Sequence, residues 1–233
     1  MLDDSPDCKW RFDESECIFS LLNQEEKSIL GKNHTLTFYK KNEYIYKEGE
    51  LSTGLQYLEE GKVKLIKGGI GLREQIIRMI SNKALIGYRS LLANEPHDDT
   101  AVAIEDSFIV TIPREILYNV LLRNYHFSLA ILKDLAIELG FSHHRMISLS
   151  QKHIRGRLAE SILLLKEKYG FEHDDKTLRV YLSREELSNL SNMTASNCVR
   201  TLTAFSGEKV IATDGRKIKI LDVEQLEKIS KQG

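Results

Sequence analysis

The spacing of apolar and polar residues divides the chain into a helical start, a strand-rich middle and a helical end. Between about Thr35 and Ile112, short runs of alternating apolar and polar residues are separated by turn glycines. This pattern is typical of a small all-β roll or barrel. We expect two β-hairpins in it, one across the glycines at 68–71 and one joining 101–104 to 107–112. After Pro113 the apolar residues recur at helical spacing, which predicts a return to helices.

A long helix is predicted from about His126 to Leu149, because the segment has a helical apolar stripe and no proline. Its heptad-spaced positions are apolar at first and polar later: Leu132, Ala136, Leu139, His143, Met146, Ser150 and His153. A helix this long cannot bury both faces against a small β-domain, so a coiled coil between two subunits is expected to bury the second face. The alternative is a helix that packs entirely within one chain. The residues assigned to the dimer interface are Leu132, Leu139, His143 and Met146.

Two short helices joined by a tight turn are predicted between residues 182 and 202. Ser183 with Glu186 three positions later forms a capping box, and Thr194 is placed to cap the second helix. The second helix is expected to bury Cys198, Val199, Leu202 and Phe205. Its other face carries short polar side chains and one arginine, which suits the major groove of DNA. These polar residues are Ser196, Asn197, Arg200 and Thr203. An ordinary pair of packed helices is the alternative.

A β-hairpin is predicted at residues 211–220, where apolar and polar residues alternate around an Asp-Gly pair. A helix-turn-helix followed by a hairpin is a winged helix. Arg216, Lys217 and Lys219 place three cations on this wing, where they can meet the phosphate backbone. The alternative is a solvated hairpin whose lysines protect its edge.

The net charge of −1 does not by itself indicate nucleic-acid binding, but the charge is unevenly distributed. Residues 151–233 hold 15 Lys+Arg against 12 Asp+Glu, and residues 1–150 hold 18 against 22. This distribution fits an acidic sensor joined to a basic DNA-binding part. We find no signal peptide and no 18-residue apolar stretch, which predicts a cytoplasmic protein without a membrane span. No phosphate loop or nucleophile motif indicates an enzyme.

The cysteines indicate no metal site. Cys8, Cys17 and Cys198 lack the spacing of a disulfide framework or a zinc site, and an iron-sulfur cluster is not expected because it normally needs four ligands. The seven histidines leave heme open as an alternative cofactor. Titration of His143 near the dimer seam is a further option.

Three strings of residues carry a family resemblance by their order and spacing. The first is Ile-Tyr-Lys-Glu-Gly-Glu at 45–50, with Gly-Lys-Val at 61–63; the second is Gly-Arg-Leu-Ala at 156–159; the third is Ser-Arg-Glu-Glu-Leu at 183–187. Together they resemble the CRP/FNR superfamily of bacterial transcription regulators. The resemblance implies an α+β fold. Its parts are a cyclic-nucleotide-binding-like β-roll (a double-stranded β-helix) at 1–125, a dimerisation helix at 126–152 and a winged helix-turn-helix DNA-binding domain at 153–233.

The resemblance implies a homodimer that regulates transcription by binding a two-fold symmetric site in double-stranded DNA. A small-molecule effector in the β-roll would control it, and RNA polymerase would be a further partner. Residue by residue, Arg184 and Thr194 would contact phosphates and Arg200 a guanine edge. Many members have a glutamate where this chain has Ser196, so the half-site should differ from the usual ones. Ser196, Asn197 and Arg200 are the candidates for reading bases.

The expected effector pocket departs from the cyclic-AMP-binding members of that family. Tyr88 stands where a ribose-binding carboxylate would be, and Asp99 stands where an arginine would hold the cyclic phosphate. An aspartate repels a phosphate, and Arg89 could only partly offset it. The effector is therefore expected not to be cyclic AMP. The residues assigned to the pocket are Gly87, Tyr88, Arg89, Asp99, Thr100, Ser142 and His143.

A second hypothesis is an effector-binding module that regulates a protein partner and uses its winged helix for protein contacts. Arg184, Arg200 and the basic wing favour the DNA-binding regulator. The sequence leaves open the effector, the operator and the sign of regulation.

Overall fold

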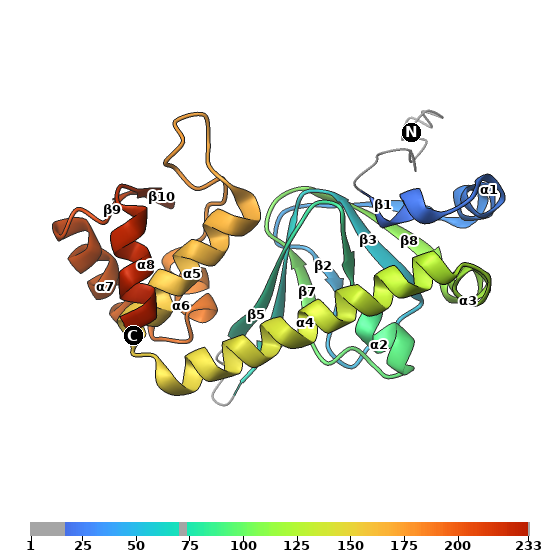
Figure 1. Ribbon diagram of the computed structural model, residues 1–233, viewed down its shortest axis with the longest axis horizontal. Coiled ribbons are helices and arrows are strands. Elements are labelled where there is room, and N and C mark those ends of the chain that lie inside the picture. Colours follow the sequence, from blue (N-terminus) through green and yellow to red (C-terminus); the bar gives the residue numbers. More distant parts are fainter. Residues whose placement is uncertain (1–16, 70–73, 233) are drawn as a thin grey trace. The chain divides into compact units, whose positions relative to one another are not determined.

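The computed structural model describes residues 17–69 and 74–232 (Figure 1). They pack as two compact units, which we call the β-roll unit (Met1–Leu65 with Met79–Leu139) and the winged-helix unit (Ile66–Arg78 with Gly140–Gly233). Among the described residues, no helix has the length and apolar character needed to cross a membrane.

The first eight strands form two four-stranded sheets, with the orders β1-β8-β3-β6 and β2-β7-β4-β5. Their bounds are β1 Thr35–Tyr39, β2 Tyr44–Tyr46, β3 Gly54–Glu60, β4 Lys62–Gly68, β5 Glu74–Ser81, β6 Ala84–Ile86, β7 Thr100–Ala103 and β8 Ser107–Pro113. The turn between β3 and β4 requires Gly61, whose φ is +110° and whose Cβ would lie 2.2 Å from Ser107 Oγ. The predicted strand-rich middle of the chain is confirmed.

One of the two predicted hairpins is present and the other is wrong. β4 and β5 are neighbours in the second sheet, although part of their predicted turn lies outside the described residues. β7 and β8 do not pair, because residues 104–106 carry the chain from one sheet to the other and β8 lies between β1 and β3. Both strands are largely buried, so sheet packing outweighs the local turn signal.

Helices close the β-roll unit around an aromatic core. The short helix η1 (Ile18–Leu21) inserts Phe19 between Tyr57 and Phe127, with ring centroids 5.0 Å and 5.8 Å away. Asn23 caps α1 (Gln24–Asn33) through a capping box with Glu26. The remaining helices of this unit are α2 (Tyr88–Ala93), α3 (Arg114–Arg123) and the first part of α4 (Tyr125–Gln151).

The winged-helix unit is built on three helices, a hairpin and a C-terminal helix. These are α5 (Ile154–Tyr169), α6 (Arg184–Leu190), α7 (Ala195–Gly207), β9 (Ile211–Asp214), β10 (Lys217–Ile220) and α8 (Val223–Gln232). Its core includes Leu158, Leu187, Phe205 and Leu226, all of which are fully buried. This confirms the predicted α+β architecture of β-roll, long helix and winged helix-turn-helix.

The long helix agrees with the prediction, since α4 spans Tyr125–Gln151 against an expected helix from about His126 to Leu149. Its first part packs with the β-roll unit and its last part with the winged-helix unit. The division into three domains at 125 and 152 therefore stays a prediction.

Candidate DNA-binding and effector sites

Local capping sets the geometry of the helix-turn-helix. Ser183 Oγ accepts a hydrogen bond from Glu186 N at 3.1 Å, and Glu186 Oε2 accepts one from Ser183 N at 2.8 Å. Thr194 Oγ1 accepts from Asn197 N at 3.2 Å and so begins α7. These caps satisfy backbone donors that a helix N-terminus otherwise leaves unpaired. The capping pattern predicted from the sequence is confirmed.

The apolar stripe of α7 differs from the prediction at one residue. Cys198, Leu202 and Phe205 are buried, but Val199 is 48% exposed. Successive helical residues lie about 100° apart, and the buried side of this helix turns from Cys198 toward Thr201 and Leu202, which leaves Val199 outside it. Val199 instead joins the exposed face, where an apolar side chain can contact a thymine methyl group. The spacing i, i+4, i+7 from Cys198 would have identified the correct stripe.

The predicted base-reading residues lie together on the outer face of α7. Ser196 and Arg200 are exposed and Asn197 is half-buried. Arg200 Nη2 donates to Asn197 Oδ1 at 2.8 Å, so the amide orients the guanidinium on this face. Thr194 Oγ1 lies 3.1 Å from Ser196 Oγ at the N-terminus of the helix. The arrangement provides hydrogen-bond donors and acceptors on a surface free of bulky groups.

Arg184 makes a contact that the sequence did not predict. Its Nη2 donates to the carbonyl of Gly215 at 2.8 Å and so ties the start of α6 to the tip of the wing. Its Nη1 is buried and has no hydrogen-bond partner among the described residues. The side chain therefore serves the fold of the winged helix, and the phosphate contact implied by the family resemblance stays a prediction.

The wing is an antiparallel hairpin with a two-residue loop. Lys217 pairs with Asp214, which leaves Gly215 and Arg216 at the tip, and Gly215 has a φ of +53°. Arg216 and Lys217 are exposed. The third predicted cation, Lys219, is held by Asp174 at 3.0 Å, so the wing presents two cations rather than three.

The expected effector residues lie around α2 and the loop that precedes β7. Gly87 begins α2 with a φ of +63°, and a Cβ there would lie 2.7 Å from His97 Cε1. Tyr88 is buried in the core and its hydroxyl donates to Asp134 of α4. This differs from the effector-facing position expected for Tyr88, because apolar neighbours and the Asp134 carboxylate hold the ring inward.

The other effector residues are occupied by contacts within the chain. Asp99 Oδ1 accepts from Tyr46 Oη at 2.7 Å, and Thr100 Oγ1 accepts from Glu48 N at 3.0 Å. Arg89 is paired with Asp98 at 2.8 Å and with Glu95 at 3.2 Å. The Arg89 guanidinium is thus already paired with two carboxylates, and Asp99 adds a third negative charge to the same loop.

His97 is a feature of this region that the sequence analysis did not single out. Its ring stacks on Tyr46 with centroids 3.7 Å apart, and its Nδ1 is buried without a partner among the described residues. Burial lowers the pKa of His97, which the carboxylates of Glu50 and Asp98 partly oppose. The stacking depends on a contact 51 positions away in the chain, which local patterns do not show.

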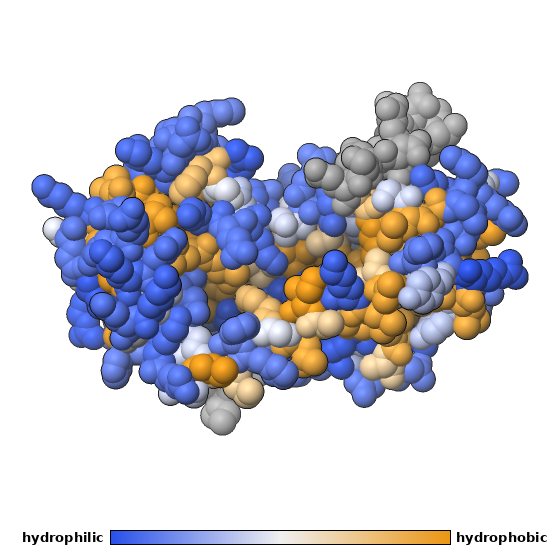
Figure 2. All heavy atoms as spheres, viewed as in Figure 1, coloured by the Kyte–Doolittle hydropathy of each residue, from blue (hydrophilic) through white to orange (hydrophobic). Residues whose placement is uncertain are grey.

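The residues assigned to the dimer interface form an exposed apolar stripe on α4. Leu132, Leu139 and Met146 are 61%, 58% and 63% exposed, and His143 is exposed among them. Figure 2 shows hydrophobic side chains uncovered along the course of this helix. Ser142 is also exposed and, with His143, belongs to the winged-helix unit. The assignment of these two residues to the effector pocket stays a prediction.

Within residues 17–69 and 74–232, no group of three or more His, Cys, Asp or Glu side chains could hold a metal ion. Cys17 and Cys198 are buried free thiols, and Cys8 lies outside the described residues. Burial raises the pKa of Cys198 to about 11, although Arg184 opposes the shift. Such a thiol is protonated at neutral pH and is therefore a poor nucleophile.

Comparison with known proteins gives matches over most of the chain. Residues 36–124 match the cyclic nucleotide-binding domain family, and residues 156–229 match the Crp-like helix-turn-helix domain family. The transcriptional activator protein Anr of Pseudomonas protegens is 25% identical over 190 residues, covering 80% of this chain and 77% of Anr. A CRP-like cAMP-activated global transcriptional regulator of Mycobacterium tuberculosis is 24% identical, covering 91% of this chain and 92% of that protein.

Among solved structures, FixK2 from Bradyrhizobium japonicum superposes with a TM-score of 0.76 at 21% identity. The match covers 84% of this chain and 96% of FixK2. These similarities do not favour an enzyme or a module that acts only through protein contacts.

Proposed function

The chain belongs to the CRP/FNR family of transcription regulators, and on that premise we propose that it binds a two-fold symmetric DNA site as a homodimer. The observation that carries this proposal is the exposed polar face of α7, which follows directly from the caps and the buried stripe of that helix. One such helix would enter the major groove of each half-site.

The roles of the side chains follow from their chemistry and position. Arg200, oriented by Asn197 at 2.8 Å, can donate two parallel hydrogen bonds to a guanine edge. Ser196 can donate to or accept from a base, and the exposed Val199 suits a thymine methyl group. Backbone N–H groups at the start of α7 favour a phosphate beside Thr194.

The wing supplies a second set of contacts. Arg216 and Lys217 are exposed at and beside its tip and can neutralise phosphates without reading sequence. Specificity would therefore come from α7, while the wing would contribute most of the dependence of affinity on salt.

A homodimer explains the exposed apolar stripe of α4. Leu132, Leu139 and Met146 recur at heptad spacing, and each is more than half exposed in the single chain. A parallel coiled coil would bury them against the same residues of a second copy. The two copies would then present two α7 helices to the two halves of a symmetric site.

The effector site lies in the β-roll. Its chemistry argues against cyclic AMP as the effector, although some relatives are described as cAMP-activated. Arg89 of α2 is already paired with Glu95 and Asp98. Asp99, in the loop that precedes β7, would repel a bound phosphate because both are negatively charged. We therefore place a ligand without a clamped phosphate in this site. RNA polymerase is proposed as a further partner, and the cytoplasm as the location, because the target is bacterial DNA.

Selection from a random double-stranded DNA library tests this proposal. The purified full chain is expected to enrich one inverted repeat, and the Arg200→Ala variant is expected to lose that enrichment. Arg123→Ala, which removes an exposed arginine from α3, is the matched control and should enrich the same repeat. If the wild-type protein enriched no sequence from the library, sequence-specific DNA binding would be refuted.

A further inference from the structure

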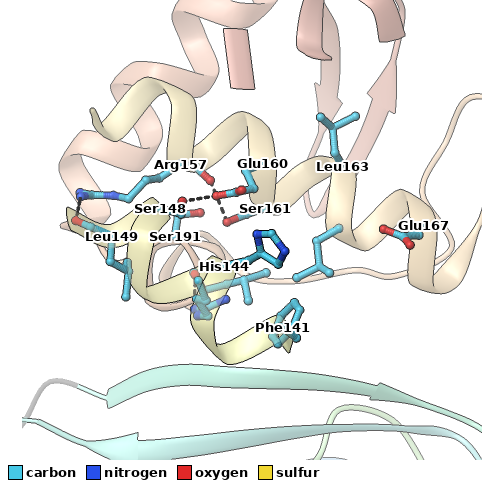
Figure 3. Close-up of a pocket in the computed structure, with 13 residues that line it drawn as sticks. Phe141, His144, Ser148, Leu149, Arg157, Glu160, Ser161, Leu163, Glu167 and Ser191 are labelled. Carbon is cyan, nitrogen blue, oxygen red and sulfur yellow. Dashed lines mark hydrogen bonds between the residues drawn. The ribbon is translucent and has the colours of Figure 1, made fainter. Parts of the chain in front are cut away.

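The winged-helix unit contains a cavity of about 260 Å³ that has no part in DNA reading (Figure 3). Its walls are the last part of α4, one face of α5 and the end of α6, so residues of this unit alone form it. None of the residues assigned to base or phosphate contacts lines it.

Arg145 of α4 is a cation at this cavity that lacks a carboxylate partner among the described residues. Its Nη2 donates to the carbonyl oxygens of Ile76 and Leu190, each at 2.7 Å, which fixes the direction of the guanidinium. No carboxylate within the described residues forms an ion pair with it. Burial lowers the pKa of Arg145, so the charged form is held in an environment that disfavours it. Two carbonyl dipoles offset a buried charge less well than an anion does.

Glu160 also lines the cavity, but other groups already offset its charge. Its Oε2 accepts from the Ser148 hydroxyl, and its Oε1 lies 2.9 Å from Lys152 Nζ. Figure 3 shows the bond from Ser148 to Glu160. Arg157, which also lines the cavity, donates to backbone carbonyls among the described residues. Since Lys152 already pairs with Glu160, the two lining arginines are left with Glu167 as the other lining carboxylate.

A second polar group at the cavity wall is unsatisfied. Ser191, at the end of α6, is 2% exposed, and its Oγ has no hydrogen-bond partner among the described residues. The Nε of Arg157 is buried and unpartnered in the same way. A buried polar group without a partner costs about 1–3 kcal/mol, so such groups usually have one in the functional state of a protein. Two of them among the residues that line one cavity indicate an acceptor that is supplied from outside the chain.

The remaining walls are apolar. Phe141, Leu149, Leu163 and Leu164 also line the cavity. Figure 3 shows the Phe141 ring on the side opposite Arg157. Apolar walls with a few polar groups at one end are typical of sites for small organic molecules.

We propose that this cavity binds a small amphipathic carboxylate, with the carboxylate on Arg145 and Ser191 and the apolar body against Phe141 and Leu164. Both N–H groups of Arg145 Nη2 are already given to carbonyl oxygens, so Nη1 is left to donate a charge-assisted hydrogen bond to the carboxylate. A free inorganic anion could accept the same bond without using the apolar walls. The site is distinct from the β-roll effector site and does not depend on the proposed DNA binding.

Titration calorimetry on the full chain with three probes of one skeleton tests the charge preference. The probes are 3-phenylpropionate, 3-phenylpropan-1-ol and 3-phenylpropylamine. We expect the acid to bind at least about tenfold more tightly than the alcohol, and the amine to bind most weakly, because only the acid forms a charge-assisted pair. Equal affinity for acid and alcohol, or no binding of the acid at millimolar concentration, would overturn the proposal.

Two variants locate the binding. Ser191→Ala removes a hydroxyl that has no hydrogen-bond partner in the described part of the chain, so folding should be unaffected while affinity for the acid falls by about 2- to 10-fold. Ser206→Ala in α7 is the matched control, because Ser206 Oγ is also buried and, among the residues that the structure describes, without a partner, but it does not line the cavity. Leu164→Trp should fill the cavity and abolish binding.

Binding that survives Leu164→Trp in a folded protein, checked by circular dichroism, would place the probe elsewhere and contradict the assignment. The same preparations can be tested for selection of DNA. A preparation that selects DNA but does not bind the acid refutes the cavity proposal alone. A preparation that binds the acid but selects no DNA sequence refutes the proposed function alone.

Discussion

Replacement of Arg200 by alanine separates folding from DNA recognition more sharply than any other single change. The side chain is exposed on α7, and its hydrogen bond within the described residues goes to Asn197 three residues earlier on the same helix. Such a pair stabilises a helix by about 0.2–0.5 kcal/mol, and alanine has the best helix propensity. The free energy of unfolding should therefore change by less than about 0.5 kcal/mol.

The loss in DNA binding should be much larger. A bidentate contact between arginine and guanine is worth about 1–3 kcal/mol of discrimination, and a homodimer makes it once in each half-site. The specific affinity should then fall by about 2–6 kcal/mol, which is roughly 30-fold to 20,000-fold at 1.4 kcal/mol per tenfold change. Affinity for unrelated DNA should fall far less, because the wing cations Arg216 and Lys217 are unchanged.

Fluorescence anisotropy measures both affinities at one fixed salt concentration, with the selected repeat and a scrambled duplex as probes. Thermal unfolding of the same samples reports the stability. The reasoning is refuted if Arg200→Ala keeps the wild-type ratio of specific to non-specific affinity. It is also refuted if the variant loses more than about 1 kcal/mol of stability, since the side chain would then serve the fold.

Three further predictions test the other parts of the account. Leu139→Glu should give a monomer or an aggregate by light scattering, because it places like charges opposite each other in the proposed seam; a stable dimer would move the interface elsewhere. Calorimetry with cyclic AMP and cyclic GMP should give constants weaker than micromolar, because Arg89 is already paired and Asp99 repels a phosphate; a micromolar constant for either nucleotide would contradict this. Burial lowers the pKa of His97 below the 6.5 of the unfolded chain, so its contribution to stability is complete above pH 6.5 and is lost as the pH falls toward the folded pKa. His97→Gln should therefore flatten the fall in unfolding free energy between pH 7.5 and 5, and an unchanged slope would exclude His97 as its cause.

Local signals in the sequence predicted the parts of the fold that depend on neighbouring residues. Ser183 and Thr194 act within one helical turn, so their caps follow from spacing alone. The wing follows from a two-residue loop whose first position, Gly215, has a positive φ. The starts of the two helices in the DNA-reading part were accordingly predictable.

Contacts between distant residues were not predictable in the same way. β7 and β8 separate because each finds its neighbours in a different sheet. Tyr88 turns inward to meet Asp134, and Arg184 meets the carbonyl of Gly215, which are 46 and 31 positions away. The sequence shows that these residues can form hydrogen bonds but does not show which partner the fold brings to them.

The central claim is that two copies of this chain present two α7 helices to one symmetric DNA site. Hydroxyl-radical footprinting of the full chain on its selected sequence tests this most directly. The account predicts two protected segments related by two-fold symmetry, with centres about one helical turn or a multiple of it apart. A single protected segment, or uniform protection without symmetry, would contradict it.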